Sequence, residues 1–178
     1  MAGANMRKFL FLLIPFLSVT AFACDENCKR DAAMAEHDVR FPSYLTASYC
    51  RDTSVDFLLR ARDSLSSYQE KNLPTGHKGG MRNIRTFLQQ RKQWLEECDQ
   101  YLSLTGQGRV FRDEATTQQI LDAIDAVSSE LERLMGSGTG VRVPQSQVAG
   151  ADHRLELLFS AMDNHRTELQ LRGQLVIR

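Results

Sequence analysis

The sequence predicts an all-α protein, a four- to five-helix bundle built on a helical hairpin that a disulfide closes. From residue 24 onwards, apolar residues recur at steps of three and four, as on one face of a helix, without a convincing series of alternating strands. Segments that contain Gly or Pro separate these helical stretches. Four cysteines flank the stretches, a number that suits two disulfides.

The first 23 residues have the pattern of a cleaved export signal. Two basic residues at positions 7 and 8 precede an apolar run over 9–19, and Ala21-Phe22-Ala23 supplies the small residues of a cleavage site. The run is too short to span a bilayer, and Pro15 interrupts it. We therefore expect a periplasmic protein whose mature part has no transmembrane segment.

Cleavage after residue 23 would make Cys24 the first residue of the mature chain. This leaves an alternative open, a bacterial lipoprotein that is anchored to the membrane through the Cys24 thiol. The bulky Phe22 stands where lipoprotein signals usually carry a small residue.

The four cysteines allow three pairings, and the expected hairpin favours one of them. If residues 52–72 and 79–104 are antiparallel helices with a loop centred near residue 75, Cys50 lies 25 residues before that centre and Cys98 lies 23 after it. The two thiols then lie side by side, and Cys24–Cys28 follows by elimination. Because Cys-x-x-x-Cys is not the Cys-x-x-Cys of a zinc knuckle or thioredoxin-like site, we expect structural disulfides and neither metal nor cofactor.

The first half of the mature chain contains three expected helical stretches. Residues 25–39 form a short helix that ends before Pro42, and residues 43–51 add a turn or two. Asp52 is expected to cap the next helix, over 52–72. The helix over 79–104 has the strongest amphipathic pattern. Its apolar positions are Met81, Ile84, Phe87, Leu88, Trp94, Leu95, Cys98, Tyr101 and Leu102.

The second half begins with a helix that Asp113 is expected to cap. Its apolar residues are separated by steps of 4, 3, 4 and 3, a pattern typical of a helix in a bundle. Residues 24–135 therefore form the bundle domain, 136–150 a flexible linker, and 151–178 a C-terminal helix. The sequence leaves open whether this last helix docks on the bundle or engages a partner. In the helix that Asp113 is expected to cap, the apolar residues are Ile120, Ile124, Val127, Leu131 and Leu134.

Charge and motif content argue against several classes of protein. Residues 24–178 carry 20 Lys and Arg against 22 Asp and Glu, whereas a nucleic-acid binder normally needs a basic face. Two His-x-x-Glu pairs, at His153 and His165, lie on different faces of a continuous helix, so they cannot share an ion and are expected to face solvent. His77 is expected to be exposed in its Gly-rich loop. No Gly-x-Ser-x-Gly motif occurs, and we expect neither catalytic residues nor an enzyme.

One stretch of the chain resembles a known family. Cys50, the helix from Asp52, the segment Gln90-Arg91-Lys92-Gln93-Trp94-Leu95 and Cys98 are similar to the N-terminal domain of lysozyme inhibitors of the LprI type. This family contains many small exported bacterial proteins, and the resemblance covers about 50 residues. It implies a disulfide-closed helical hairpin outside the cytoplasm and makes lysozyme a candidate partner.

The sequence favours a non-enzymatic accessory protein that binds another protein of the bacterial envelope. The place of Trp94 on the strongest helix favours a core residue, and the alternative is a contact residue that anchors an interface. Arg109, Phe111 and Arg112, in the loop at 105–112, are the other candidates. The alternative function is inhibition of lysozyme or another cell-wall hydrolase, through an exposed loop such as 73–80.

Overall fold

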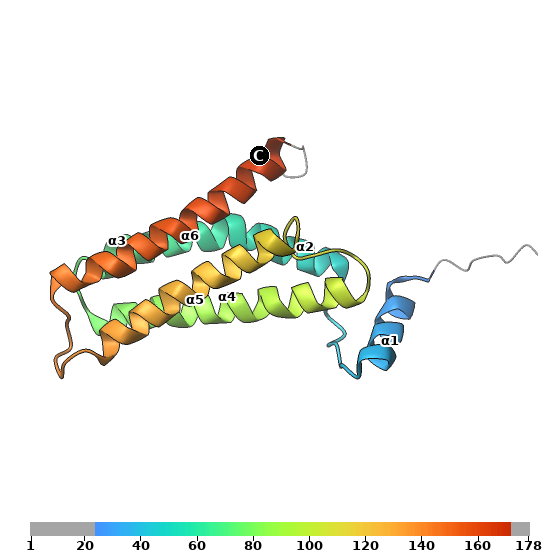
Figure 1. The fold of residues 1–178 in the computed structure, drawn as a ribbon, viewed down its shortest axis with the longest axis horizontal. Helices are drawn as coiled ribbons and strands as arrows, with labels where there is room; N and C mark the ends of the chain where they lie inside the picture. Colours follow the sequence, from blue (N-terminus) through green and yellow to red (C-terminus); the bar gives the residue numbers. More distant parts are fainter. Residues whose placement is uncertain (1–23, 172–178) are drawn as a thin grey trace, which may run out of the picture.

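The computed structural model describes residues 24–171, and all the regular elements in this part of the chain are helices (Figure 1). The predicted export signal, residues 1–23, lies outside the described residues, as does the end of the expected C-terminal helix. The all-α fold class is confirmed. The elements are α1 (Glu26–His37), α2 (Ala47–Asp56), the π-helical segment η1 (Phe57–Ala61), α3 (Arg62–Asn72), α4 (Lys78–Leu104), α5 (Glu114–Gly136) and α6 (Gln145–Leu171). None of these helices is long and apolar enough to cross a membrane.

Four long rods form the bundle, because α2, η1 and α3 follow one another without a break (Figure 1). The α4 helix packs against this first rod and against α5, and α5 packs against α6. The α6 helix in turn reaches α3 and η1, and its Leu155, Leu158 and Met162 are fully buried. The last helix therefore docks on the bundle, which answers the question that the sequence left open.

The α5 helix has the structure that its apolar spacing predicts. Its five apolar positions at steps of 4, 3, 4 and 3 are all completely buried. Asp113 caps the helix, since its carboxylate accepts a hydrogen bond from the backbone N–H of Thr116 at 2.7 Å. The cap and the regular pattern explain why the expected start of this helix is confirmed.

The start of α2 differs from the expectation, and the prediction that Asp52 caps a helix is wrong. Thr46 is the cap, because its hydroxyl accepts a hydrogen bond from the N–H of Tyr49 at 3.1 Å. The helix is therefore already formed when the chain reaches Asp52, whose side chain is exposed. Most of the segment 43–51, expected to form only a turn or two, therefore belongs to the first rod.

The η1 segment has no counterpart in the sequence-based expectation. Its turns hold more residues than those of an α-helix, yet Phe57, Leu58 and Ala61 are all buried. On the C-terminal side of η1, the buried face of the rod continues with Leu65 of α3. The π-helical turns therefore shift the phase of the rod while keeping its apolar side against the core.

The connection between α5 and α6 is shorter than expected, because α6 begins at Gln145 rather than at residue 151. The predicted boundary of the linker is wrong, since Val148 lies in the helix and is buried. Val143, also buried, donates its N–H to the carbonyl of Gly76 at 2.9 Å. Gly76 has a φ of 63°, and a Cβ there would lie 2.3 Å from the Val143 carbonyl oxygen, so only glycine fits this contact.

The α1 helix lies at one end of the bundle, outside the main core (Figure 1). It ends at His37, where Asp38 adopts a left-handed conformation, and not directly before Pro42. The carboxylate of Glu26 accepts hydrogen bonds from the N–H of Ala47 and, at 3.0 Å, from the hydroxyl of Tyr101. One side chain of α1 thus ties it to the start of α2 and the end of α4.

Both expected disulfides are present, and they differ in burial. Cys50–Cys98 joins α2 to α4 and is completely buried. Cys24–Cys28 lies at the start of α1, and both of its residues are exposed. One bridge therefore links two helices of the core, whereas the other closes a single turn at the surface.

Candidate binding groove

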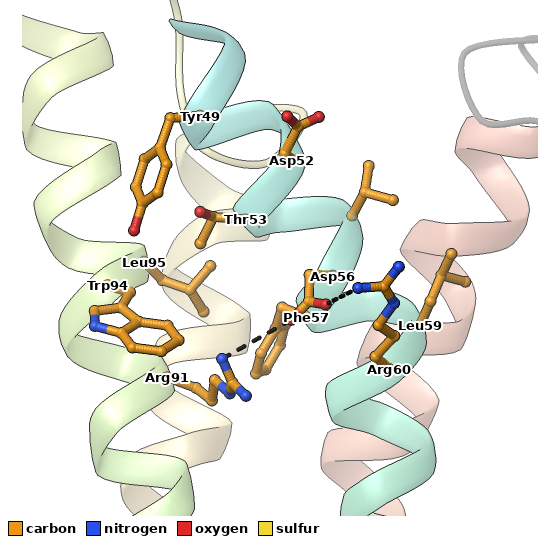
Figure 2. Close-up of a pocket in the computed structure, with 11 residues that line it drawn as sticks. Tyr49, Asp52, Thr53, Asp56, Phe57, Leu59, Arg60, Arg91, Trp94 and Leu95 are labelled. Atoms are coloured by element: carbon orange, nitrogen blue, oxygen red, sulfur yellow. Dashed lines mark ion pairs between the residues drawn. The ribbon is translucent and has the colours of Figure 1, made fainter. Parts of the chain in front are cut away.

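A groove with a volume of about 490 Å³ opens along α2 and η1 and extends to α4 (Figure 2). From the first rod, Tyr49, Thr53 and Phe57 line it, and α4 contributes Trp94 and Leu95. The charged residues of its lining are Asp52, Asp56, Arg60 and Arg91. We call this site the α2–α4 groove.

Helical spacing on α4 places Trp94 at the edge of the buried face. Leu95 and Cys98 are completely buried and point into the bundle. Trp94 is 40% exposed, so the interpretation of Trp94 as a core residue is wrong. Phe87 and Arg91 precede it by seven and three residues, which puts all three on one side of the helix. Trp94 therefore presents part of its indole ring to the groove.

Arg91 is held in place by two rings and one carboxylate. The carbon of its guanidinium lies 4.6 Å from the ring centroid of Trp94 and 4.8 Å from that of Phe87. Its Nη1 atom lies 3.8 Å from Oδ2 of Asp56 on α2, as Figure 2 shows. These cation–π and ionic contacts fix Arg91 over one face of the indole.

Exposed aromatic residues gather where the first rod meets α4. Tyr44, Tyr68 and Trp94, which we call the seam aromatics, are 51%, 38% and 40% exposed. The Tyr44 ring packs edge-on against Tyr49, with centroids 5.4 Å apart, and the Tyr68 ring packs in the same way against Phe87, at 5.7 Å. Trp, Tyr and Arg are the residue types that most often dominate binding energy at protein interfaces. This composition makes the seam a candidate binding surface.

Tyr44 connects the loop before α2 to α4. Its hydroxyl donates a hydrogen bond to Oε2 of Glu97 at 3.2 Å. Loss of solvent around the hydroxyl, followed by the negative charge of Glu97, raises the pKa of Tyr44 above its ordinary value. The phenol therefore stays protonated at neutral pH and remains a hydrogen-bond donor.

The carboxylates of the groove have unequal surroundings. Asp56 meets two guanidinium groups, with Arg60 at 3.6 Å and Arg91 at 3.8 Å. The side chain of Asp52, one turn earlier on the same helix, makes no hydrogen bond or ion pair with any residue in 24–171. The groove thus contains one carboxylate that is open to a ligand.

Two features of the fold hold the groove open. The buried Cys50–Cys98 bridge fixes the distance between α2 and α4 at one end of the groove. Cys50 directly follows Tyr49 on α2, and Cys98 lies one turn after Trp94 on α4. At the other end, η1 provides Phe57, which is only 1% exposed and lies beneath the groove. Single π-helical turns inside α-helices are frequent at functional sites. The groove therefore has a rigid, cross-linked frame.

Three of the four predicted contact residues lie away from the groove. Arg109 donates hydrogen bonds from Nε and Nη2 to the two carboxylate oxygens of Asp99, at 3.0 and 2.6 Å. Arg112 forms ion pairs with Asp113 and with Glu168 of α6. These contacts fasten the loop between α4 and α5 to the bundle. Of the predicted residues, only Trp94 lies in the groove.

Phe111 differs most from its expected position, because it is buried rather than presented by the loop. It is 5% exposed, and its ring centroid lies 6.1 Å from that of Phe57 and 5.3 Å from that of His165. The prediction that both histidines of α6 face solvent is also wrong, since His165 is 4% exposed. Phe111 and His165 therefore belong to the packing between α6 and the first rod.

The described residues also show where the remaining candidate chemistry lies. His77 is exposed, as expected, and caps α4, because its Nδ1 accepts a hydrogen bond from the N–H of Gly79 at 3.1 Å. Within residues 24–171, no three His, Cys, Asp or Glu side chains are grouped so that they could hold a metal ion. The groove is thus the most developed site in this part of the chain.

Sequence reasoning missed Tyr49, Asp56 and Phe57 as groove residues. The only signal for Tyr49 is its place beside Cys50, and that signal appears only once the disulfide pairing is accepted. Comparison of the chain with protein-family models, with curated proteins and with solved structures finds no match. The function of the groove is therefore argued from its own residues.

Proposed function

We propose that the protein is a non-enzymatic accessory factor of the bacterial envelope that binds a segment of another envelope protein in the α2–α4 groove. The observation that carries this proposal is the exposed indole of Trp94, which lies in the groove with Tyr49 and beside the ordered guanidinium of Arg91. Two disulfides suit an oxidising compartment outside the cytoplasm. The periplasm and the export signal are part of the same proposal.

The chemistry of the groove supports binding rather than catalysis. Its lining contains no histidine, cysteine or serine, and its two carboxylates lie one turn apart on a single helix. Thr53 is the only aliphatic hydroxyl among the lining residues, without a lining imidazole to activate it. Aromatic area, an ordered guanidinium and a carboxylate are instead suited to contact with a protein segment.

Site-specific photo-crosslinking tests the proposal in cells of the source organism. The photoreactive residue p-benzoylphenylalanine replaces Trp94 in one variant and Leu157, which is 53% exposed on α6, in the control. We expect one discrete protein adduct from position 94 and none from position 157. The partner, once purified, should bind Trp94→Ala at least about tenfold more weakly than Leu157→Ala, as for a hot-spot residue. Equal adducts at both positions, or unchanged binding by Trp94→Ala, would overturn the proposal.

The alternative function, inhibition of lysozyme or another cell-wall hydrolase, is expected to use the loop at 73–80. In the structure, Leu73 is 1% exposed, and the loop lies against Val143 of the connection before α6. A cell-wall clearing assay separates the alternatives. Inhibition by the wild type but not by Trp94→Ala would make the hydrolase the partner of the groove. Equal inhibition by both would place an inhibitory segment elsewhere.

A further inference from the structure

The charges around the α2–α4 groove indicate what kind of segment fits it. Arg60 and Arg91 share the carboxylate of Asp56, and Arg91 is also stacked on Trp94 and Phe87. Asp52 lines the same groove and its carboxylate forms no ion pair in the described part of the chain. The charge that lacks a partner at this site is therefore negative.

The apolar part of the groove is formed by residues of both α2 and α4. Tyr49 and Thr53 flank Asp52 on the same helix, and Trp94 and Leu95 face them from α4 (Figure 2). An apolar side chain placed there would cover indole surface that is now in contact with water. A ligand that combines an apolar group with a cation would satisfy both features.

The position of Arg91 argues against a sugar ring as the occupant. Sugar rings generally stack on an open aromatic face, whereas the guanidinium of Arg91 already covers one face of Trp94 at 4.6 Å. The side chain of a peptide needs only the ring edge and the space beside it. The face of Trp94 that Arg91 covers is therefore not free to stack on a sugar ring.

We infer that the segment bound by the α2–α4 groove carries a bulky apolar residue beside a Lys or Arg, whose cation pairs with the carboxylate of Asp52. This inference rests on the proposed function, because it names the chemistry of the partner at that same site. The apolar group contacts Trp94, and the basic group supplies the counter-charge that the chain itself does not provide.

Trp94 provides a direct readout, because it is the only tryptophan in the chain. The probes are three ten-residue peptides without tryptophan. The first combines Leu and Lys, the second has Glu in place of each Lys, and the third has Ala in place of each Leu. Binding to the purified, oxidised protein is followed by the fluorescence of Trp94 and by its quenching with acrylamide. Chitotetraose serves as the glycan probe.

We expect the Leu–Lys peptide to reduce acrylamide quenching of Trp94 and to bind at least about tenfold more tightly than either of the other peptides. Asp52→Asn should weaken its binding about fivefold, the effect of one partly exposed ion pair. The matched control is Asp122→Asn on α5, whose exposed carboxylate contacts only Gln118, and it should bind as the wild type does. Added salt should reduce the difference between the two variants.

Other outcomes separate this inference from the proposed function. Equal binding of the Glu peptide, or equal binding by Asp52→Asn and Asp122→Asn, would overturn the inferred charge while leaving the groove as a protein-binding site. Protection of Trp94 by chitotetraose and by none of the peptides would overturn both proposals. Binding of the Leu–Lys peptide without any change at Trp94 would place its site elsewhere and would also contradict the inference.

Discussion

The helix contacts around α5 and those between α2 and α4 end in opposite states. Around α5, the five apolar positions are completely buried, and outer charges pair across helices, as in Arg85–Glu132 at 3.0 Å and Lys92–Asp125 at 2.8 Å. Where α4 meets the first rod and the loop before it, the three seam aromatics remain between 38% and 51% exposed. The first interface is closed by its own residues, whereas the second leaves aromatic surface exposed.

The physical origin of this difference lies in side-chain size and in covalent geometry. The α5 positions carry Ile, Val and Leu, which fill the space between neighbouring helices. The α2–α4 contact contains large rings, a π-helical segment and a disulfide that fixes the helix spacing. The α5 contacts are thus filled by aliphatic side chains, whereas the α2–α4 contact joins a buried disulfide to partly exposed aromatic rings.

A pair of aromatic truncations should show the largest contrast. Phe111→Ala removes a ring that is 5% exposed and should lower the free energy of unfolding by about 4 kcal/mol. Trp94→Ala removes a ring that is 40% exposed and should cost roughly 1 to 2 kcal/mol. Urea denaturation measures both values. A cost for Trp94→Ala as large as that for Phe111→Ala would mean that the α2–α4 contact is a closed core.

The two disulfides offer a second contrast. Replacing Cys50 and Cys98 by Ala opens a loop between residues 48 apart and should cost about 4 kcal/mol on the chain-entropy model. Replacing Cys24 and Cys28, only 4 residues apart, should cost about 2 kcal/mol. The first pair should also lose binding of the Leu–Lys peptide, and the second should keep it. Retained binding without Cys50–Cys98 would show that the bridge does not hold the groove open.

A smaller effect separates the true helix cap from the expected one. Thr46→Ala should lower the free energy of unfolding by about 1 kcal/mol, because the N–H of Tyr49 loses its acceptor. Asp52→Ala should change it by less than about 0.5 kcal/mol, since Asp52 has no partner among the described residues. Chemical denaturation of the two variants tests this order. A reversed order would restore Asp52 as the cap.

The smallest expected effect is a pH dependence at the start of α5. A hydrogen bond from the backbone of Thr116, with help from its hydroxyl and from Arg112, lowers the pKa of Asp113 from 3.8 to about 2. The charged carboxylate therefore stabilises the fold fully above pH 4, and this contribution is lost as the pH falls from about 4 to about 2. Asp113→Asn keeps a capping side chain that does not titrate. Wild type should lose more stability than this variant over that range, and equal losses would contradict the assignment.

The parts of the fold that the sequence predicts well are those fixed by local signals. The α5 helix has a regular apolar spacing and an Asp113 cap, and the hairpin symmetry is enough to pair Cys50 with Cys98. The η1 segment follows no such signal, because no Gly or Pro marks Phe57–Ala61. Its phase shift becomes visible only in the folded rod.

The candidate site was harder to predict, because it depends on contacts between distant segments. Trp94 and Leu95 are neighbours on one helix, and spacing alone does not tell which of them faces the core. Phe111 lies in a loop, but Phe57 and His165 come from two other segments to bury it. Residue type and spacing therefore do not decide whether Trp94 faces the core, and they predict the wrong place for Phe111.

The indole of Trp94 is 40% exposed in the free chain, and we propose that a partner in the α2–α4 groove covers it. Acrylamide quenching of the single tryptophan tests it, with and without the purified protein that crosslinks at position 94, provided that this partner's tryptophans are replaced by Phe. We predict ready quenching in the free protein and strong protection in the complex. Protection already present in the free protein, or quenching that the partner leaves unchanged, would contradict the claim.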